Sequence, residues 1–268
     1  MAPIETAPSD VDGLTAHDET RLLNGRVVCL QPKAGYRTAI DPVFLAAAVN
    51  AKVGERILDA GSGTGAASLC LAARVDGVQI TGVEIQPAYA ALSRKSAELN
   101  GWSQRIRFID GDLASLPTTP AFREFDHIMT NPPYMQTGRG RTPPDSGKAR
   151  ATVETDLGLS QWISLCTRMI RSRGTLTLIH RADRLEHIMA AMAGVFGQIV
   201  VYPLWPGTGA GSDQRPDSAS RVLVTGRKSL NSPGELKSGL CLHNPGDGSY
   251  TAAAQSVLID GNALSLLT

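Results

Sequence analysis

The sequence predicts an α/β fold in which a mostly parallel sheet is covered by helices on both faces. Short runs rich in β-branched and other apolar residues alternate with amphipathic segments of helical length over most of the chain, as in βαβ units. The last two such runs, 198–203 and 221–227, are separated only by a loop rich in Gly, Pro and Ser, so they are expected to pair antiparallel.

The elements are expected in the following order. Asn24-Gly25 between apolar pairs predicts a tight hairpin, and Asp41-Pro42 predicts the start of a helix with Asp41 as its N-cap. Strands of the sheet are expected at 56–60, 79–84, 105–109, 125–130, 175–180, 198–203 and 221–227. Helices are expected at 65–74, 87–99, 159–172 and 183–193.

The length of 268 residues fits one large domain with appendages. Residues 1–20 contain five acidic residues, no basic ones and no hydrophobic period, which predicts a disordered acidic tail. The domain then comprises 21–268, divided into a hairpin and helix (21–55), the core (56–228) and a C-terminal extension (229–268). Without the tail the chain carries a net charge of +6 against +1 overall, which permits a polyanionic partner.

Composition excludes several classes of protein. With 42% hydrophobic and 19% charged residues, and no apolar run near the ~18 residues of a membrane span, a globular cytoplasmic protein is expected. The first residues lack the basic and apolar regions of a secretory signal. Neither the five histidines nor the cysteines have metal-ligand spacing, so no metal site is expected. The cysteines are expected to be reduced and buried: Cys29, Cys70, Cys166 and Cys241.

A glycine-rich turn follows the first expected strand of the sheet and opens a helix. Its sequence places Asp59 before Gly61, Gly63 and Gly65. Glycines allow a sharp turn and close approach of a ligand to the backbone, and the helix N-terminus offers free N–H groups. The same glycines, followed by Ala66, also fit a dinucleotide-binding turn, and a plain tight βα turn remains an alternative.

Acidic residues end the next two strands. Glu84 lies 19 residues after Gly65, where a carboxylate can accept both hydroxyls of a ribose, a group that nicotinamide and S-adenosyl cofactors share. Asp112, in Asp110-Gly111-Asp112, is a candidate acceptor for an adenine amino group, and a simple turn explains this triplet equally well.

The most informative motif is Asn131-Pro132-Pro133-Tyr134, at the end of the fourth expected strand. Two prolines and an aromatic residue at a strand tip give up backbone donors that an ordinary loop would keep. The Asn131 side-chain oxygen and the Pro132 carbonyl can accept the two hydrogens of a planar amino group, while Tyr134 stacks on its ring. The four residues therefore predict methyl transfer to a nitrogen whose lone pair is delocalised.

In this order the motifs resemble the class I S-adenosylmethionine-dependent methyltransferases that methylate amino groups. The opening LNGRVVCLQPKAGYRTAIDPVFLAA, the segment ARATVETDLGLSQWI and the late DGSYTAAAQSVL resemble the bacterial tRNA(Val) adenine-N6 methyltransferases. The resemblance implies a Rossmann-like, seven-stranded sheet in the order 3-2-1-4-5-7-6 with the seventh strand antiparallel. It also implies S-adenosyl-L-methionine as cofactor and a tRNA adenine as substrate.

The resemblance also assigns roles to individual residues. The cofactor would be held by Asp59, Gly61, Gly63, Gly65, Glu84, Asp112 and Asn131, and the target amine by Asn131, Pro132, Pro133 and Tyr134.

The loop 137–151 carries a net charge of +3 and would contact RNA phosphates through Arg139, Arg141, Lys148 and Arg150. An incidental surface charge is the alternative interpretation of this loop.

Three other functions are alternatives. Glutamine-N5 methylation of release factors is the main alternative, because a side-chain amide nitrogen is delocalised in the same way. A nicotinamide oxidoreductase would have no use for the Asn131 motif, and a non-catalytic tRNA-binding module would not need the residues for methyl transfer.

Overall fold

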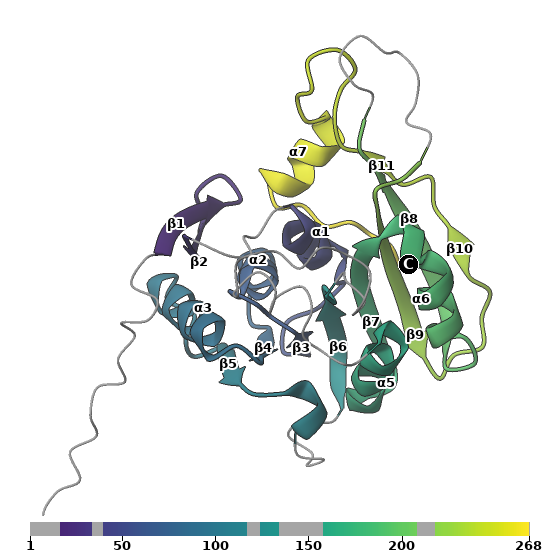
Figure 1. Ribbon diagram of the computed structural model, residues 1–268, viewed down its shortest axis with the longest axis horizontal. Helices are drawn as coiled ribbons and strands as arrows, with labels where there is room; N and C mark the ends of the chain where they lie inside the picture. Colours follow the sequence, from purple (N-terminus) through teal and green to yellow (C-terminus); the bar gives the residue numbers. More distant parts are fainter. Residues whose placement is uncertain (1–16, 34–39, 117–123, 134–157, 208–217, 268) are drawn as a thin grey trace, which may run out of the picture.

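The fold is built around one large sheet with helices on both faces (Figure 1). The computed structural model describes residues 17–33, 40–116, 124–133, 158–207 and 218–267. The strands of this sheet are β3 (Arg56–Ala60), β4 (Gln79–Glu84), β5 (Ile106–Asp110), β6 (Phe125–Thr130), β7 (Ile170–Arg181), β8 (Phe196–Trp205), β9 (Arg221–Lys228), β10 (Glu235–Leu236) and β11 (Leu240–Cys241).

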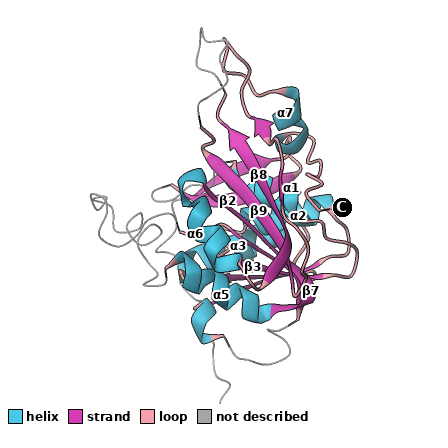
Figure 2. Cartoon of the chain, turned by 90° about the vertical axis from the view of Figure 1, so that its right-hand side faces the viewer, coloured by secondary structure: helices cyan, strands magenta, loops and turns pink. Residues whose placement is uncertain are grey.

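The strand order confirms the predicted topology. The sheet runs β10-β8-β9-β7-β6-β3-β4-β5, so its first seven strands in the chain follow the order 3-2-1-4-5-7-6. β9 lies antiparallel between β7 and β8 (Figure 2), whereas β3 to β7 are parallel to one another. The expected count of seven strands is wrong, because the short β10 and β11 also pair with β8 and make nine.

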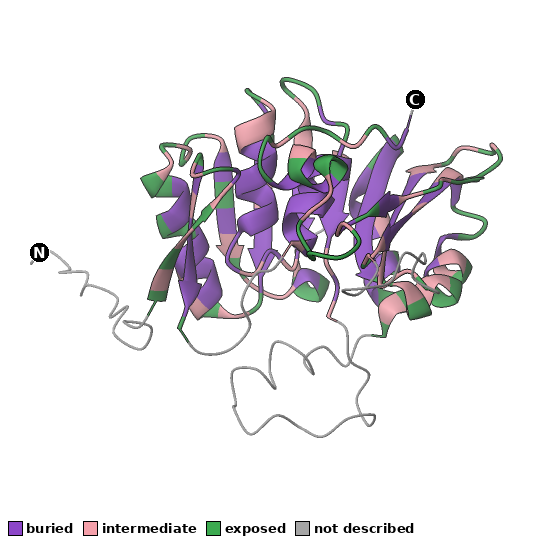
Figure 3. Cartoon of the chain, turned by 90° about the horizontal axis from the view of Figure 1, so that it is seen from above, coloured by how far each residue is buried: buried purple, intermediate pink, exposed green. Residues whose placement is uncertain are grey.

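Helices cover the sheet in two groups. One face is covered by α1 (Asp41–Ala48), α2 (Ala66–Arg74) and α3 (Pro87–Leu99), with α7 (Ala252–Leu258) packed beside α1. The other face is covered by α5 (Leu159–Met169) and α6 (Leu185–Met192). Two 3-10 turns, η2 (Leu113–Ser115) and η4 (Ala182–Arg184), precede β6 and α6. Buried residues gather along the strands and on the helix sides that face them (Figure 3).

The predicted hairpin is present and extends further toward the N-terminus than expected. β1 (His17–Leu22) pairs with β2 (Val27–Pro32), and Asn24 and Gly25 have the positive φ angles of a tight turn. The expected tail boundary at residue 20 is wrong, because residues 17–20 belong to β1. Residues 1–16 lie outside the described part of the chain.

Two further expectations need correction. Ile40 is the N-cap of α1, whereas Asp41 is its first helical residue and its Oδ2 accepts a hydrogen bond from Arg221 Nε at 2.9 Å. Of the four cysteines, all free, three are buried, but Cys241 is exposed because it lies on a short edge strand. None of the helices within the described ranges has the length and apolar character that a membrane span needs.

Candidate active site

The glycine turn joins β3 to α2 at the carboxyl end of the sheet. All three glycines have positive φ: +72° at Gly61, +55° at Gly63 and +83° at Gly65. A Cβ on Gly65 would lie 2.6 Å from the Phe108 ring, so this position needs glycine for packing as well as for conformation. A Cβ on Gly63 would meet no atom within 4 Å among the described residues, so the backbone there is open to a ligand.

Asp59 supports the turn from below. Its side chain is 2% exposed, and its Oδ2 accepts a hydrogen bond from Ser68 Oγ at 2.7 Å, which ties β3 to the first turn of α2. Burial raises the pKa of the Asp59 carboxyl to about 7, against the opposing effect of the Ser68 hydrogen bonds. The Asp59 carboxyl therefore supports the turn. Its ionisation in the folded protein costs more free energy than the ionisation of an exposed carboxyl.

Glu84 ends β4 beside this turn and is held by backbone donors. The N–H of Gly63 donates to Glu84 Oε2 at 2.8 Å, and the N–H of Gln86 donates to Oε1 at 2.9 Å. Burial raises the pKa of this carboxyl, and the backbone donors oppose the rise. Because each carboxylate oxygen keeps a further lone pair, both can still accept a hydroxyl hydrogen.

Asp112 lies in the turn that follows β5. Its Oδ1 accepts the N–H of Ala114 at 2.9 Å and so caps η2, which favours the turn interpretation of this triplet. Leu113 is 5% exposed and packs into the core beneath. The structure thus gives Asp112 a structural task, which does not conflict with a role toward an adenine ring.

Residues 131–133 follow β6 directly. The preceding Thr130 is fully buried, and its Oγ1 donates to the carbonyl of Ala60 at 2.7 Å, so the end of β6 is bonded to the end of β3 where the glycine turn begins. Asn131 and Pro133 are partly buried and Pro132 is buried. The structure therefore brings Asn131, Pro132 and Pro133 to the same edge of the sheet as the glycine turn and Glu84.

The remaining predicted site residues lie outside the described part of the chain. These are Tyr134, Arg139, Arg141, Lys148 and Arg150.

Two buried residues near the site are not among the site residues predicted from the sequence. Trp162 on α5 is 7% exposed; its indole lies against Gly61, and its Nε1–H donates to Thr130 Oγ1 at 2.9 Å. His180, at the end of β7, hydrogen-bonds the Pro133 backbone, and burial lowers the pKa of its imidazole to about 4. The helical spacing of Trp162 predicts only a core residue, and no motif marks His180, because their contacts with the site depend on elements that are neighbours only in the folded protein.

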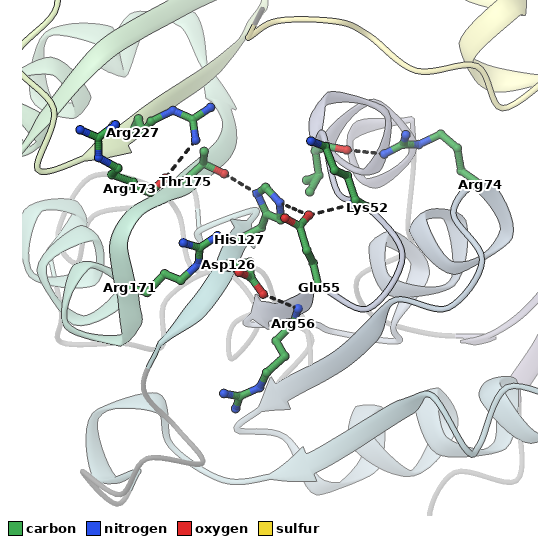
Figure 4. A network of polar contacts seen from close by, with 11 residues as sticks. Lys52, Glu55, Arg56, Arg74, Asp126, His127, Arg171, Arg173, Thr175 and Arg227 are labelled. Atoms are coloured by element: carbon green, nitrogen blue, oxygen red, sulfur yellow. Dashed lines mark hydrogen bonds and ion pairs between the residues drawn. The ribbon is translucent and has the colours of Figure 1, made fainter.

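A second polar cluster lies at the opposite end of the sheet (Figure 4). His127 is within hydrogen-bonding distance of Thr175 Oγ1 (2.7 Å) and Glu55 Oε2 (2.9 Å), and burial lowers the pKa of its imidazole. These side chains border a cavity of about 100 Å3. Because Glu55 and His127 lie at the amino ends of β3 and β6, the cluster cannot act on a ligand at the glycine turn.

The site fits S-adenosylmethionine. Ser62, within the glycine turn, has a buried Oγ with no hydrogen-bond partner among the described residues, and Gly63 beside it leaves open space. The donors and acceptors of the turn and the carboxylate of Glu84 suit the polar groups of this cofactor. No group of three His, Cys, Asp or Glu side chains capable of holding a metal occurs within the described ranges.

Comparison with known families and structures agrees with this geometry. Residues 57–139 match a family described as a methyltransferase domain, a span that contains the glycine turn, Glu84 and the Asn131 motif. A solved structure from Agrobacterium tumefaciens, described as a predicted O-methyltransferase, is 26% identical with a TM-score of 0.66, covering 84% of this chain and 98% of that one. A tRNA (m1A58) methyltransferase from Aquifex aeolicus, 14% identical, shares the fold with a TM-score of 0.52 over 75% of this chain and 73% of that one.

Fold, site and matched domain together show that the chain contains a class I S-adenosylmethionine-dependent methyltransferase domain. Among its relatives are proteins named tRNA1(Val) (adenine(37)-N6)-methyltransferase. The one from Porphyromonas gingivalis is 32% identical over 136 residues, which cover 50% of this chain and 52% of that protein. The one from Aeromonas hydrophila is 26% identical over 220 residues, covering 82% and 87%. The chain thus aligns with about half the length of the Porphyromonas relative.

Proposed function

We propose that the protein transfers a methyl group from S-adenosylmethionine to the exocyclic N6 amine of an adenine in tRNA. The observation that carries this proposal is the bonded connection between the end of β6, which presents Asn131, and the glycine turn that begins after Ala60. It places an acceptor for an amino group next to the turn that suits the methyl donor.

In the proposed reaction the cofactor supplies an electrophilic methyl group on a sulfonium. The Asn131 side-chain oxygen and the Pro132 carbonyl accept the two hydrogens of the amine, which draws the nitrogen toward a tetrahedral geometry. Its lone pair forms the new N–C bond, the C–S bond breaks and the sulfur keeps that electron pair. The resulting ammonium then loses a proton to water, so no general base is required. Catalysis by this site is mainly positioning.

The choice of adenine over a glutamine amide rests on the relatives. Several similar proteins from different bacteria carry a name that specifies adenine 37 of tRNA1(Val), whereas the Asn131 motif alone suits either nitrogen. Release-factor methylation therefore remains the second candidate. The basic residues Arg139, Arg141, Lys148 and Arg150 support an RNA substrate through their charge.

The Asn131→Ala variant tests the proposal. It removes one acceptor for the amine and leaves the glycine turn and Glu84 in place, so single-turnover methyl transfer to total tRNA should fall by ~100-fold or more. Affinity for S-adenosylhomocysteine, measured by calorimetry, should fall far less than the rate, because the glycine turn and Glu84 still bind the cofactor, and the melting temperature should change little. The control is Gln104→Ala, an exposed polar residue at the amino end of β5, which should keep the parent rate.

The same assay separates the candidate functions. Methyl transfer to purified release factor but not to tRNA would replace the proposed substrate by a glutamine amide. An Asn131→Ala variant that transfers methyl within a few-fold of the parent rate would refute the role of the motif.

A further inference from the structure

One side chain contacts both halves of the candidate active site. Trp162 lies on α5, a helix that packs against β7 (Figure 1). A Cβ built on Gly61 would lie 3.1 Å and 3.2 Å from its Cζ2 and Cη2, so the edge of the indole lies directly against the first glycine of the turn. The Nε1–H of the same ring donates to Thr130 Oγ1 at 2.9 Å.

Thr130 continues the connection back to β3. Its hydroxyl accepts from Trp162 and donates its own hydrogen to the carbonyl of Ala60 at 2.7 Å, so it is used in both directions. Thr130 immediately precedes Asn131, and Ala60 immediately precedes Gly61. The Trp162 indole, the Thr130 hydroxyl and the Ala60 carbonyl are thus joined by hydrogen bonds. This link connects the residue before Asn131 with the residue before Gly61.

Burial makes this link stiff. Thr130 is 0% exposed and Trp162 is 7% exposed, so water does not compete for their hydrogen bonds. The link has few alternatives, because a rotated indole would leave a buried N–H without an acceptor and would lose its packing on Gly61. A hydrophobic side chain at position 162 could fill the space beside Gly61. Without an N–H donor, however, it could not hold the Thr130 hydroxyl in one orientation.

We infer that Trp162 and Thr130 are positioning residues that set the separation and direction between Asn131 and the glycine turn. This inference rests on the proposed function for its effect on rate. Neither residue touches the reacting atoms. In-line methyl transfer depends steeply on the distance and angle between nitrogen, methyl carbon and sulfur, and a displacement of ~1 Å can cost ~100-fold in rate. Both reactants should still bind when the link is broken, but their alignment should be lost.

Thr130→Val tests this inference, with Thr130→Ser as the conservative variant. Valine has nearly the same shape but no hydroxyl, so the single-turnover rate should fall at least ~10-fold, whereas the affinity for S-adenosylhomocysteine should stay within ~2-fold. Serine keeps the hydroxyl and should restore most of the rate. Trp162→Phe keeps an aromatic ring beside Gly61 but loses the N–H, and it should show the same separation of rate from affinity.

A matched control removes a different buried threonine hydrogen bond. Thr177 Oγ1 and Thr225 Oγ1 are 2.9 Å apart in neighbouring strands. Thr177 pairs with Met129, so its side chain lies on the opposite face of the sheet from Thr130 and Trp162. Thr177→Val should lower the melting temperature as Thr130→Val does, without slowing the transfer by folded protein. Equal slowing by both variants, or no slowing by Thr130→Val, would overturn the inference.

A second measurement does not depend on the substrate. The sequence has three tryptophans, so a Trp102→Phe/Trp205→Phe protein keeps Trp162 as its single indole. Because this ring contacts Gly61, titration with S-adenosylhomocysteine should change its emission. Unchanged emission upon binding measured by calorimetry would contradict the inferred contact. If the parent enzyme is inactive on tRNA but the Trp162 emission changes upon binding, the proposed substrate is refuted, whereas the inferred contact between Trp162 and Gly61 stands.

Discussion

The two buried carboxylates beside the glycine turn are satisfied in different ways. Asp59 accepts hydrogen bonds from one residue, through the hydroxyl and the backbone of Ser68, whereas the two oxygens of Glu84 accept backbone N–H groups from Gly63 and Gln86. Backbone donors are fixed by the fold, so the Glu84 carboxylate is preorganised for a ligand. Asp59 instead holds the base of the turn. We therefore expect the loss of charge at Glu84 to affect cofactor binding and the loss of charge at Asp59 to affect stability.

Glu84→Gln should weaken cofactor binding. The amide keeps the size of the side chain but turns one oxygen into an NH2 group that faces a backbone N–H, and it offers the ribose one acceptor fewer. The loss of a charged acceptor costs ~1.5–3 kcal/mol, which corresponds to a ~10- to 100-fold rise in the Kd of S-adenosylhomocysteine by calorimetry. Glu98→Gln, an exposed change on α3, is the control. Unchanged affinity, or tighter binding of NAD, would exclude this role of Glu84.

Asp59→Asn should stabilise the protein in a pH-dependent way. The folded-state pKa of about 7 lies above the ordinary value of 3.8, so between these values the folded protein retains a proton that the unfolded chain has lost. The contribution of Asp59 to stability therefore falls as the pH rises from ~4 to ~7 and stays low above pH 7. Asparagine cannot ionise, so its stability advantage over the parent should grow across this window.

The measurement is a denaturant unfolding series of both proteins without cofactor at pH 5, 6, 7 and 8. The difference in unfolding free energy should rise toward ~4 kcal/mol at most by pH 8. A difference that is constant with pH would mean that Asp59 titrates normally in the folded protein.

At the scale of the elements, prediction from sequence succeeded where boundary residues are explicit. Helix α3 has the predicted bounds, because Pro87 opens it and Asn100-Gly101 follows its end. The predicted helix 159–172 is three residues too long, since Ile170 instead pairs with Phe125 and begins β7. The helical spacing of an apolar residue does not reveal that its backbone will pair with a neighbouring strand instead.

The missed elements share a different cause. β10 and β11 have two residues each and lie in a segment rich in Gly, Ser and Pro, so only pairing with β8 makes them strands. Helix α7 did carry a usable signal, because Thr251 caps it by accepting the N–H of Ala254 at 3.1 Å. In the site, Asp59, Glu84 and Asn131 are predictable from motifs at strand ends, but the contact of Trp162 requires knowledge of how α5 packs against the glycine turn and the end of β6.

The basic loop 137–151 gives the prediction that belongs to this scale. If Arg139, Arg141, Lys148 and Arg150 contact phosphates, their replacement by Ala should weaken tRNA binding and reduce the log–log salt slope by up to about one unit per lost contact. Affinity for S-adenosylhomocysteine should not change. A filter-binding series at several salt concentrations measures the slope, and an unaltered slope would leave these residues without a role in RNA binding.

For the whole molecule, cofactor binding should raise stability by linkage. The site joins residues from β3, β4 and β6, so unfolding of the sheet destroys it, and a ligand at ~100 times its Kd should add ~2.7 kcal/mol to the free energy of unfolding. Melting curves with increasing S-adenosylhomocysteine should shift upward, by several degrees at this excess. NAD at equal concentration should give no shift. An upward shift with NAD alone would contradict the assigned cofactor.

The position of β9 has a consequence for how the chain is made. β8 pairs with β9, β10 and β11, all of which follow it in the sequence. While the protein emerges from the ribosome, β8 therefore has to wait for residues 221–228 before its first sheet partner exists. Until then Val200, Val201 and Leu204, buried in the finished protein, have no strand to cover them. The right-hand part of the sheet in Figure 1 is thus completed by strands from the last third of the chain. A nascent chain that ends before β9 exposes the apolar residues of β8, which chaperones can bind.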